Sequence, residues 1–97
     1  MINNQTNNRA ELTRAVELGQ ALQKLESDPN FLLVIKDDYI MRTLIVESQG
    51  MLDQSPPIRQ EALEKIQSVN YFRQHLTKIK NSAQAALEEL NGGELDE

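Results

Sequence analysis

The sequence predicts an all-α fold: a small domain of three to four helices that ends in a long C-terminal helix. Apolar residues recur three and four positions apart through most of the 97 residues, which is the period of an amphipathic helix. The one strand-like run, Phe31–Ile35, has no second strand-like segment with which it could pair. A proline break at Pro56-Pro57 marks the start of the last helix. We expect a single helical domain over residues 9–91, between a flexible N-terminal end (1–8) and an acidic flexible tail (92–97).

Composition limits the functional classes open to this chain. It has no cysteine, which excludes disulfides, thiolate chemistry and cysteine-based zinc sites. The formal net charge of −5 argues against a nucleic-acid partner, because lysines and arginines supply most of the affinity for phosphate backbones. The longest apolar run is five residues, against the ~20 that a membrane helix needs, and the start shows no signal peptide. We expect a cytoplasmic protein with no membrane partner.

The first helix is predicted from Arg9 to about Glu26. Its apolar residues fall on one broad face: Leu12, Ala15, Val16, Leu18, Leu22 and Leu25. Gly19 lies inside this face, where glycine costs up to ~1 kcal/mol relative to alanine. Close approach of another helix backbone would account for it, and a merely tolerated glycine is the alternative.

The second helix is predicted to start at Asp28-Pro29, with aspartate as the N-cap and proline at the first helical position. The run Phe31–Ile35 then reads as a short helix, buried on nearly all sides, that anchors the core. Val and Ile also favour a strand, but a lone strand would leave its backbone groups unsatisfied.

The third helix is predicted from Asp38 to Asp53, with Asp37 and Asp38 ending the previous turn and capping the new helix. Its apolar stripe is about 140° wide on a helical wheel. One edge consists of Ile40, Leu44, Ser48 and Met51, and the other of Met41, Ile45 and Leu52, while Val46 points away. Gln54–Pro57 is a break, with Ser55 as the next cap.

The last helix is predicted from Pro57 to Leu90 and ends at Asn91-Gly92-Gly93. A heptad seam follows it through Val69, Phe72, Leu76, Ile79, Ala83, Ala86 and Leu90. At ~1.5 Å per residue such a helix is ~51 Å long, much longer than a small domain. Either it bends around Lys80–Ser82, or its far end packs on another chain.

No motif in the sequence predicts catalysis, a metal site or a cofactor. His75 is the single histidine and flanks the seam, so it can form neither a triad nor a metal site with its neighbours. Asp37 and Asp38 diverge, and Glu61 and Glu64 read as an ordinary solvated face. Glycine-rich phosphate-binding motifs are absent. We expect a protein that is not an enzyme.

The C-terminal region contains the candidate partner-binding residues. Beyond Ile79 the seam is built from small or isolated apolar residues, which suit a partner helix as well as they suit internal packing. The acidic residues that follow are candidates for docking on a basic surface. The full candidate set is Ala83, Ala86, Leu87, Leu90, Glu88, Glu89, Glu94, Asp96 and Glu97. We expect a protein partner, either a larger protein or a second copy bound through the C-terminal helix.

The stretch LESDPNFLLVIKDDYI, followed by a helix, a proline break and VNYFRQHLTKIKNSAQAALEEL, resembles small helical proteins encoded by tailed bacteriophages. The matching positions, over roughly residues 25–90, are Pro29, Phe31, Val34, Ile35, Tyr39, Phe72, Arg73, Leu76, Ala83, Ala86 and Leu87. Where that pattern has glycine before the tyrosine, this chain has Asp38. The resemblance implies an accessory or virion-associated protein without catalytic residues, located in the host cytoplasm or in a virion.

Together these observations predict a non-enzymatic protein-binding module that acts through helical faces, with phage assembly or virion structure as the specific role. The alternative is an acidic inhibitor that binds a basic surface of a host enzyme or defence protein. A charge-driven inhibitor would lose affinity steeply as salt rises, whereas a module that binds through apolar helix faces would respond little.

Overall fold

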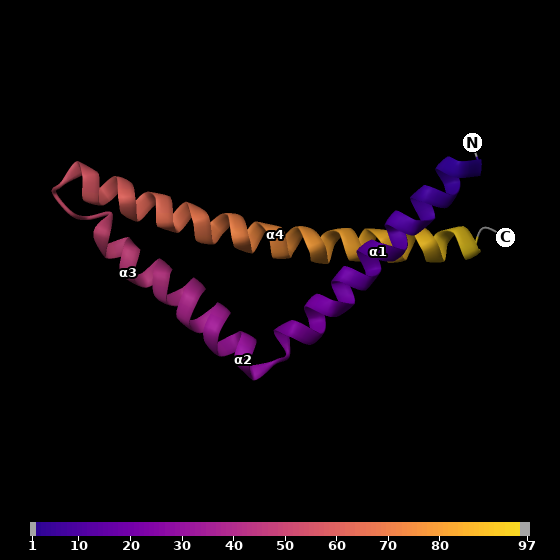
Figure 1. The fold of residues 1–97 in the computed structure, drawn as a ribbon, viewed down its shortest axis with the longest axis horizontal. Helices are drawn as coiled ribbons and strands as arrows, with labels where there is room; N and C mark the ends of the chain where they lie inside the picture. The colour runs from indigo at the N-terminus through magenta and orange to yellow at the C-terminus, as the bar shows by residue number, and fades with distance from the viewer. Residues whose placement is uncertain (1, 96–97) are drawn as a thin grey trace. The chain divides into compact units, whose positions relative to one another are not determined.

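Helix is the only regular secondary structure in residues 2–95, the part of the chain described by this computed structural model; side chains are described for residues 8–92. The elements in chain order are α1 (Ile2–Glu26), α2 (Pro29–Phe31), the π-helix η1 (Leu32–Met41), α3 (Arg42–Gly50) and α4 (Pro56–Leu95) (Figure 1). The predicted all-α fold with a long C-terminal helix is confirmed.

Both terminal helices extend further than the sequence predicted. α1 begins at Ile2 rather than Arg9, and α4 continues through Gly92 to Leu95. The sequence predicted that the helix ends at Asn91-Gly92-Gly93, but no described glycine has a positive φ, so no left-handed glycine cap ends it in this part of the chain. A glycine within a helix costs only about 1 kcal/mol relative to alanine, which does not by itself end the helix. Met1, Asp96 and Glu97 lie outside the described residues, and the side chains of residues 2–7 and 93–95 are not described either.

The chain divides into two compact units, Met1–Leu25 with Leu76–Glu97, and Glu26–His75. α4 contributes its second half to the first unit and its first half to the second. Within the described residues α4 is an uninterrupted helix, including the Lys80–Ser82 stretch where a bend was one of two alternatives. Each unit is described separately below.

In the first unit α1 crosses the second half of α4 (Figure 1). Gly19 lies directly against Ala83, because a Cβ built on Gly19 would be 2.3 Å from the Ala83 Cβ. Leu22 and Ala86, one turn further along each helix, are both buried. The close approach expected at Gly19 as one of two alternatives is therefore present, and its neighbour is α4 of the same chain.

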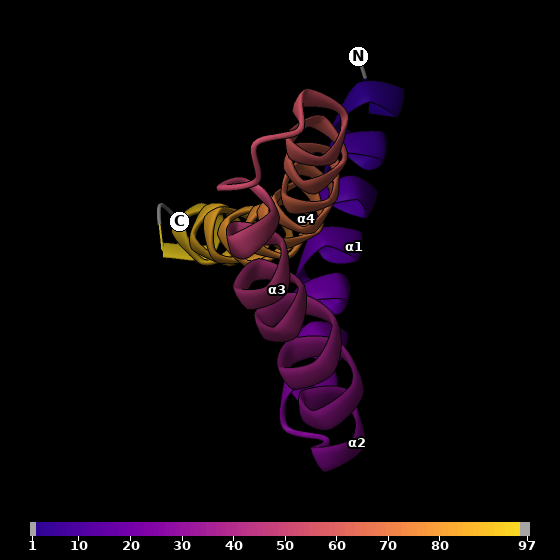
Figure 2. The same cartoon turned by 90° about the vertical axis from the view of Figure 1, so that its left-hand side faces the viewer.

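In the second unit α2, η1 and α3 follow one another as a continuous helical rod (Figure 2). The Asp28 cap is confirmed, because its Oδ1 accepts a hydrogen bond from the Asn30 N–H at 2.8 Å, with Pro29 at the first helical position. The helical reading of Phe31–Ile35 is also confirmed. The break predicted at Asp37-Asp38 is wrong, since the helical backbone passes through both residues to Gly50.

The prediction that Phe31–Ile35 is buried on nearly all sides is wrong. Leu32, Leu33 and Val34 are exposed, and Phe31 and Ile35 are only half-buried. An all-apolar run records hydrophobicity but not how many neighbours it will have, and here most of its surface stays uncovered.

The π-helix explains which residues of this segment turn inward. The less exposed positions after Phe31 are Ile35-Lys36 and Ile40, at spacings of four to five residues that suit the i→i+5 bonding of a π-helix. With α-helical spacing from Phe31, Asp38 and Arg42 would face inward instead. η1 keeps both charges outside and brings Ile40 into the core.

α3 packs against the first half of α4. A Cβ built on Gly50 would lie 2.9 Å from the Ala62 Cβ, and Ile40, Ala62 and Val69 are at most 6% exposed. The Tyr39 and Phe72 rings meet edge to face with centroids 5.8 Å apart. Between the helices the predicted break is confirmed: the Ser55 N–H donates to Asp53 Oδ1 at 2.8 Å, and the Ser55 carbonyl accepts the Arg59 N–H at 3.1 Å.

Candidate functional site

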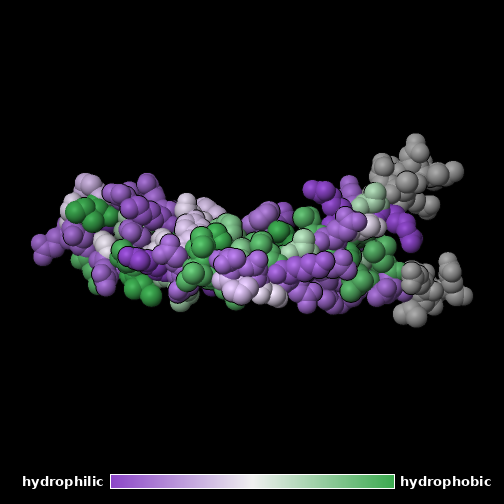
Figure 3. Space-filling model, turned by 60° about the horizontal axis from the view of Figure 1, so that its bottom comes forward, coloured by the Kyte–Doolittle hydropathy of each residue, from purple (hydrophilic) through white to green (hydrophobic). Residues whose placement is uncertain are grey.

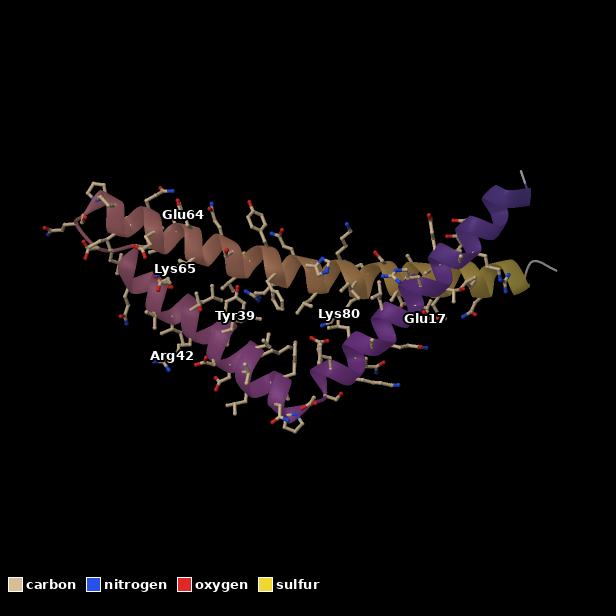
Figure 4. All side chains as sticks on the ribbon, viewed as in Figure 1. Glu17, Tyr39, Arg42, Glu64, Lys65 and Lys80 are labelled. Carbon is tan, nitrogen blue, oxygen red and sulfur yellow. The ribbon has the colours of Figure 1, made fainter. Side chains whose placement is uncertain are left out.

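A groove of about 590 Å³ lies in the second unit between the rod formed by η1 and α3 and the first half of α4. Its lining residues are Tyr39, Thr43, Glu47, Glu61, Glu64, Lys65 and Ser68. Figure 4 shows Tyr39 and Lys65 directed into the space between the two helices.

Lys65 forms ion pairs with two of the three glutamates that line this groove. Its Nζ lies 3.2 Å from Glu61 Oε1 on the same helix and 3.9 Å from Glu47 Oε1 across the groove. The hydrogen bond with Glu61, followed by the charges of Glu47 and Glu61, raises the pKa of Lys65 above its ordinary 10.5. Glu64 Oε1 accepts a hydrogen bond from Gln60 Nε2 at 3.2 Å. The charged side chains that line the groove therefore already have partners within the chain, and the Lys65–Glu47 pair links α3 to α4.

The described residues bring together no group of side chains that could hold a metal ion. No cluster of three or more His, Cys, Asp or Glu residues in this part of the chain has the arrangement of a metal site. His75 is exposed on α4 and does not line the groove. A second hollow, of about 460 Å³, is lined by residues of α1 only: Arg9, Ala10, Thr13, Arg14 and Glu17.

The structure separates the C-terminal residues that the sequence grouped as a partner-binding set. Ala83 and Ala86 face α1 within the same chain, and Leu90 is half-buried. Leu87 is exposed, as are Glu88, whose Oε1 accepts a hydrogen bond from Gln84 Nε2 at 3.0 Å, and Glu89. The Glu94 side chain and the whole of Asp96 and Glu97 lie outside the described residues. The small residues of the seam thus have an internal neighbour, which sequence reasoning could not assign.

Sequence reasoning missed the main exposed apolar surface, which lies on the second unit. Nine of the fourteen exposed large apolar side chains among residues 8–92 fall between Leu32 and Leu52. Figure 3 turns this side of the rod toward the viewer and shows apolar side chains at the surface among polar ones.

Within this surface, four residues from the end of η1 to the turn after α3 lie along one line, which we call the α3 stripe: Met41, Ile45, Ser48 and Leu52. At about 100° per residue they lie within about 60° of one another around the helix. Met41, Ile45 and Leu52 are 51%, 60% and 84% exposed. Leu52 follows α3 in a turn that continues its winding, with hydrogen bonds from Met51 N–H to the Glu47 carbonyl and from Leu52 N–H to the Gln49 carbonyl, both 3.1 Å.

The α3 stripe corrects the sequence prediction for this helix. Only part of one predicted edge, Ile40 and Leu44, turns inward, while Ser48 and Met51 on that edge are exposed. The other predicted edge, Met41, Ile45 and Leu52, faces solvent. α4 is a single neighbour and covers only part of a stripe about 140° wide.

Comparisons with known proteins add no relative: no family model, no curated protein and no solved structure matches this chain. The resemblance to tailed-phage proteins therefore stays a prediction. Among the helices of residues 2–95, none is sufficiently long and apolar to span a bilayer.

Proposed function

We propose that this chain is a non-enzymatic protein-binding module that binds through the α3 stripe. The observation that carries the proposal is the exposure of Met41, Ile45 and Leu52 along one line of a helix whose opposite side is packed. Exposed apolar surface that is contiguous, rather than scattered, marks sites of association. Phage assembly or virion structure remains the specific role that the sequence resemblance suggests.

The polar groups at the α3 stripe suit a surface that becomes buried. The Ser48 hydroxyl donates to the Leu44 carbonyl of its own helix, so covering it leaves no side-chain donor without a partner. Arg42 and Asp38 flank the stripe as a loose ion pair, with Arg42 Nη1 3.8 Å from Asp38 Oδ1 and both side chains largely exposed. Arg42 points away from α4 (Figure 4), on the solvent side of the rod. An apolar centre with a polar rim is the usual composition of a protein interface.

The methionine in the stripe also suits binding rather than internal packing. Met41 is unbranched and polarisable, and such side chains adapt to the shape of an incoming surface. Because the stripe itself carries no charge, its binding should change little with salt, in contrast to the acidic inhibitor predicted as the alternative.

Site-specific photocrosslinking tests the proposal. A photoreactive residue replaces Ile45 in the full chain, expressed in its natural cellular background, and a matched chain carries it at Gln60, an exposed polar position on α4. We expect an abundant adduct of one defined mass from position 45, insensitive to salt, and only weak, diffuse labelling from position 60. Equal labelling from both positions, or none from position 45, would show that the α3 stripe binds no protein.

A further inference from the structure

We infer that the α3 stripe binds the same stripe of a second copy of this chain, in antiparallel orientation about a two-fold axis. The inference deepens the proposed function, on which it rests, by naming the partner. It rests on the spacing of the residues in the stripe, on the residues that flank it, and on the hydrogen bond that the Ser48 hydroxyl already makes within its own helix.

The spacing of the stripe is symmetric under reversal. Its members are separated by four, three and four residues, and the same steps are met in either direction along the helix. This is the d-a-d-a spacing of a coiled-coil seam. Two copies laid antiparallel therefore match position for position, and the two-fold axis passes midway between Ile45 and Ser48. An interface of this type is self-complementary, as a two-fold dimer requires.

Each layer of such a pair joins a large residue to a suitable neighbour. Met41 meets Leu52 of the partner subunit, and Ile45 meets Ser48 of the partner subunit. The small serine gives the branched isoleucine room, and its hydroxyl is already bonded to the Leu44 carbonyl. In a parallel pair Ser48 would instead face its own copy, and one of the four layers would contain no apolar side chain.

The residues beside the stripe permit the antiparallel pairing. On one flank Arg42 approaches Gln49 of the partner subunit, so no like charges meet. On the other flank the exposed Met51 approaches Leu44 of the partner subunit, a half-buried residue at the edge of the side that packs inward. The Asp38–Arg42 pair stays at the rim, where its largely exposed side chains keep their water.

The size of the contact predicts a weak, reversible dimer. The stripe spans twelve residues, or about 16 Å of helix. Interfaces this small belong to the transient class rather than to permanent dimers. We therefore expect a dissociation constant in the micromolar range, so that monomer and dimer exchange as concentration changes.

Sedimentation equilibrium of the full chain, from about 1 µM to about 1 mM, tests the inference with two glutamate variants. Ile45→Glu places a carboxylate in the stripe. Val46→Glu is the matched control, because Val46 is also β-branched and 48% exposed but lies about 100° further round the helix. Circular dichroism of both variants serves as the check that they remain helical.

We expect the wild-type chain to pass from the 11.0 kDa monomer to the dimer within this range. Ile45→Glu should weaken the dimer at least about tenfold, because a buried carboxylate would lack a partner. Val46→Glu should leave the dissociation constant within about twofold of the wild-type value, the change expected of a rim position. A wild-type chain that stays monomeric at all concentrations, or a dimer weakened equally by both variants, overturns the inference.

Cysteine pairs test the orientation, since the natural chain contains no cysteine. Ile45→Cys and Ser48→Cys chains carrying tags of different size are mixed under mild oxidation. Antiparallel pairing predicts the mixed disulfide as the main product. Preferential disulfides between two Ser48→Cys chains indicate parallel pairing and overturn the inference.

The photocrosslink from Ile45 distinguishes failure of this inference from failure of the proposed function. An adduct of twice the chain mass supports self-association. An adduct with one different protein retains the proposed function and overturns the second copy as its partner. Absence of any adduct contradicts both the proposed function and the inference that a second copy is the partner.

Discussion

Replacing Gly19 by alanine probes the contact that closes the first unit. The new Cβ would lie 2.3 Å from the Ala83 Cβ, and it would meet an atom fixed to the α4 backbone rather than the end of a flexible side chain. Carbon atoms pack at about 3.5–4.0 Å, so the helices must separate by roughly 1.5 Å. That movement would loosen the burial of Leu22 and Ala86 one turn away.

Two opposing effects set the magnitude of this change. Alanine is the better helix former, by up to about 1 kcal/mol. Overpacking a tight contact costs about 1–3 kcal/mol, and here no flexible group can give way. We expect the overpacking term to dominate and the net loss to be about 1 kcal/mol, which lowers Tm by about 4–8 °C in a chain of this size.

Thermal unfolding followed by circular dichroism measures the effect against two controls. Gly92→Ala has no heavy atom within 4 Å of its new Cβ, so it should gain up to about 1 kcal/mol from helix propensity alone. The Gly19→Ala/Ala83→Gly double variant restores the clearance, so the two changes should be less destabilising together than the sum of their separate effects. If Gly19→Ala is stabilised as much as Gly92→Ala, α1 and α4 do not approach as described.

Three further predictions concern the second unit. Asp28→Ala removes the acceptor of the Asn30 N–H and should lower the free energy of unfolding by about 1 kcal/mol in urea titrations, whereas Asp28→Asn should retain most of it. Deleting Asp38 shortens the interval from Phe31 to Ile40 to an α-helical spacing, so η1 should become α-helical with Tm unchanged or raised. Deleting Gln67 from α4 should lower Tm, because it displaces the buried Val69. A lower Tm for the Asp38 deletion than for the Gln67 deletion would contradict the argument that the π-helical spacing sets which residues turn inward. Lys65 should titrate above pH 10.5 by NMR, and its ion-pair contribution to stability should be present below that pH and lost as pH rises through the raised pKa; a Lys65→Met chain should lack this loss.

Local chemistry made some elements predictable from the sequence. Asp28-Pro29 and the Ser55-Pro56 break follow from groups within a few residues of each other, and the structure has both. Close approach could be predicted as one alternative at Gly19, because glycine destabilises a helix and a tight helix contact offsets that cost. Its neighbour, Ala83, could not be identified, because that depends on which part of α4 folds back on α1.

Burial was predicted less well because it depends on the number of neighbours. An apolar run such as Phe31–Ile35 is hydrophobic on every side, but the run does not reveal how much of it neighbouring elements will cover, and Leu33 stays 61% exposed. The number of neighbours also decides what the small residues of the candidate binding set contact. Small residues such as Ala86 suited a partner helix and internal packing equally in the sequence, and in the structure Ala86 is buried within the first unit.

The π-helix determines which apolar edge of α3 stays exposed. A helical wheel at 100° per residue cannot show this, since it assumes one period throughout. With α-helical spacing from Phe31, Ile45 would turn inward and Ile40 outward. The wider period of η1 reverses the two: Ile40 is buried, and Ile45 becomes the centre of the α3 stripe. The π-helix η1 thus keeps Asp38 and Arg42 out of the core and leaves the uncharged α3 stripe facing solvent. The packing of the second unit therefore determines the surface through which we propose that the chain binds.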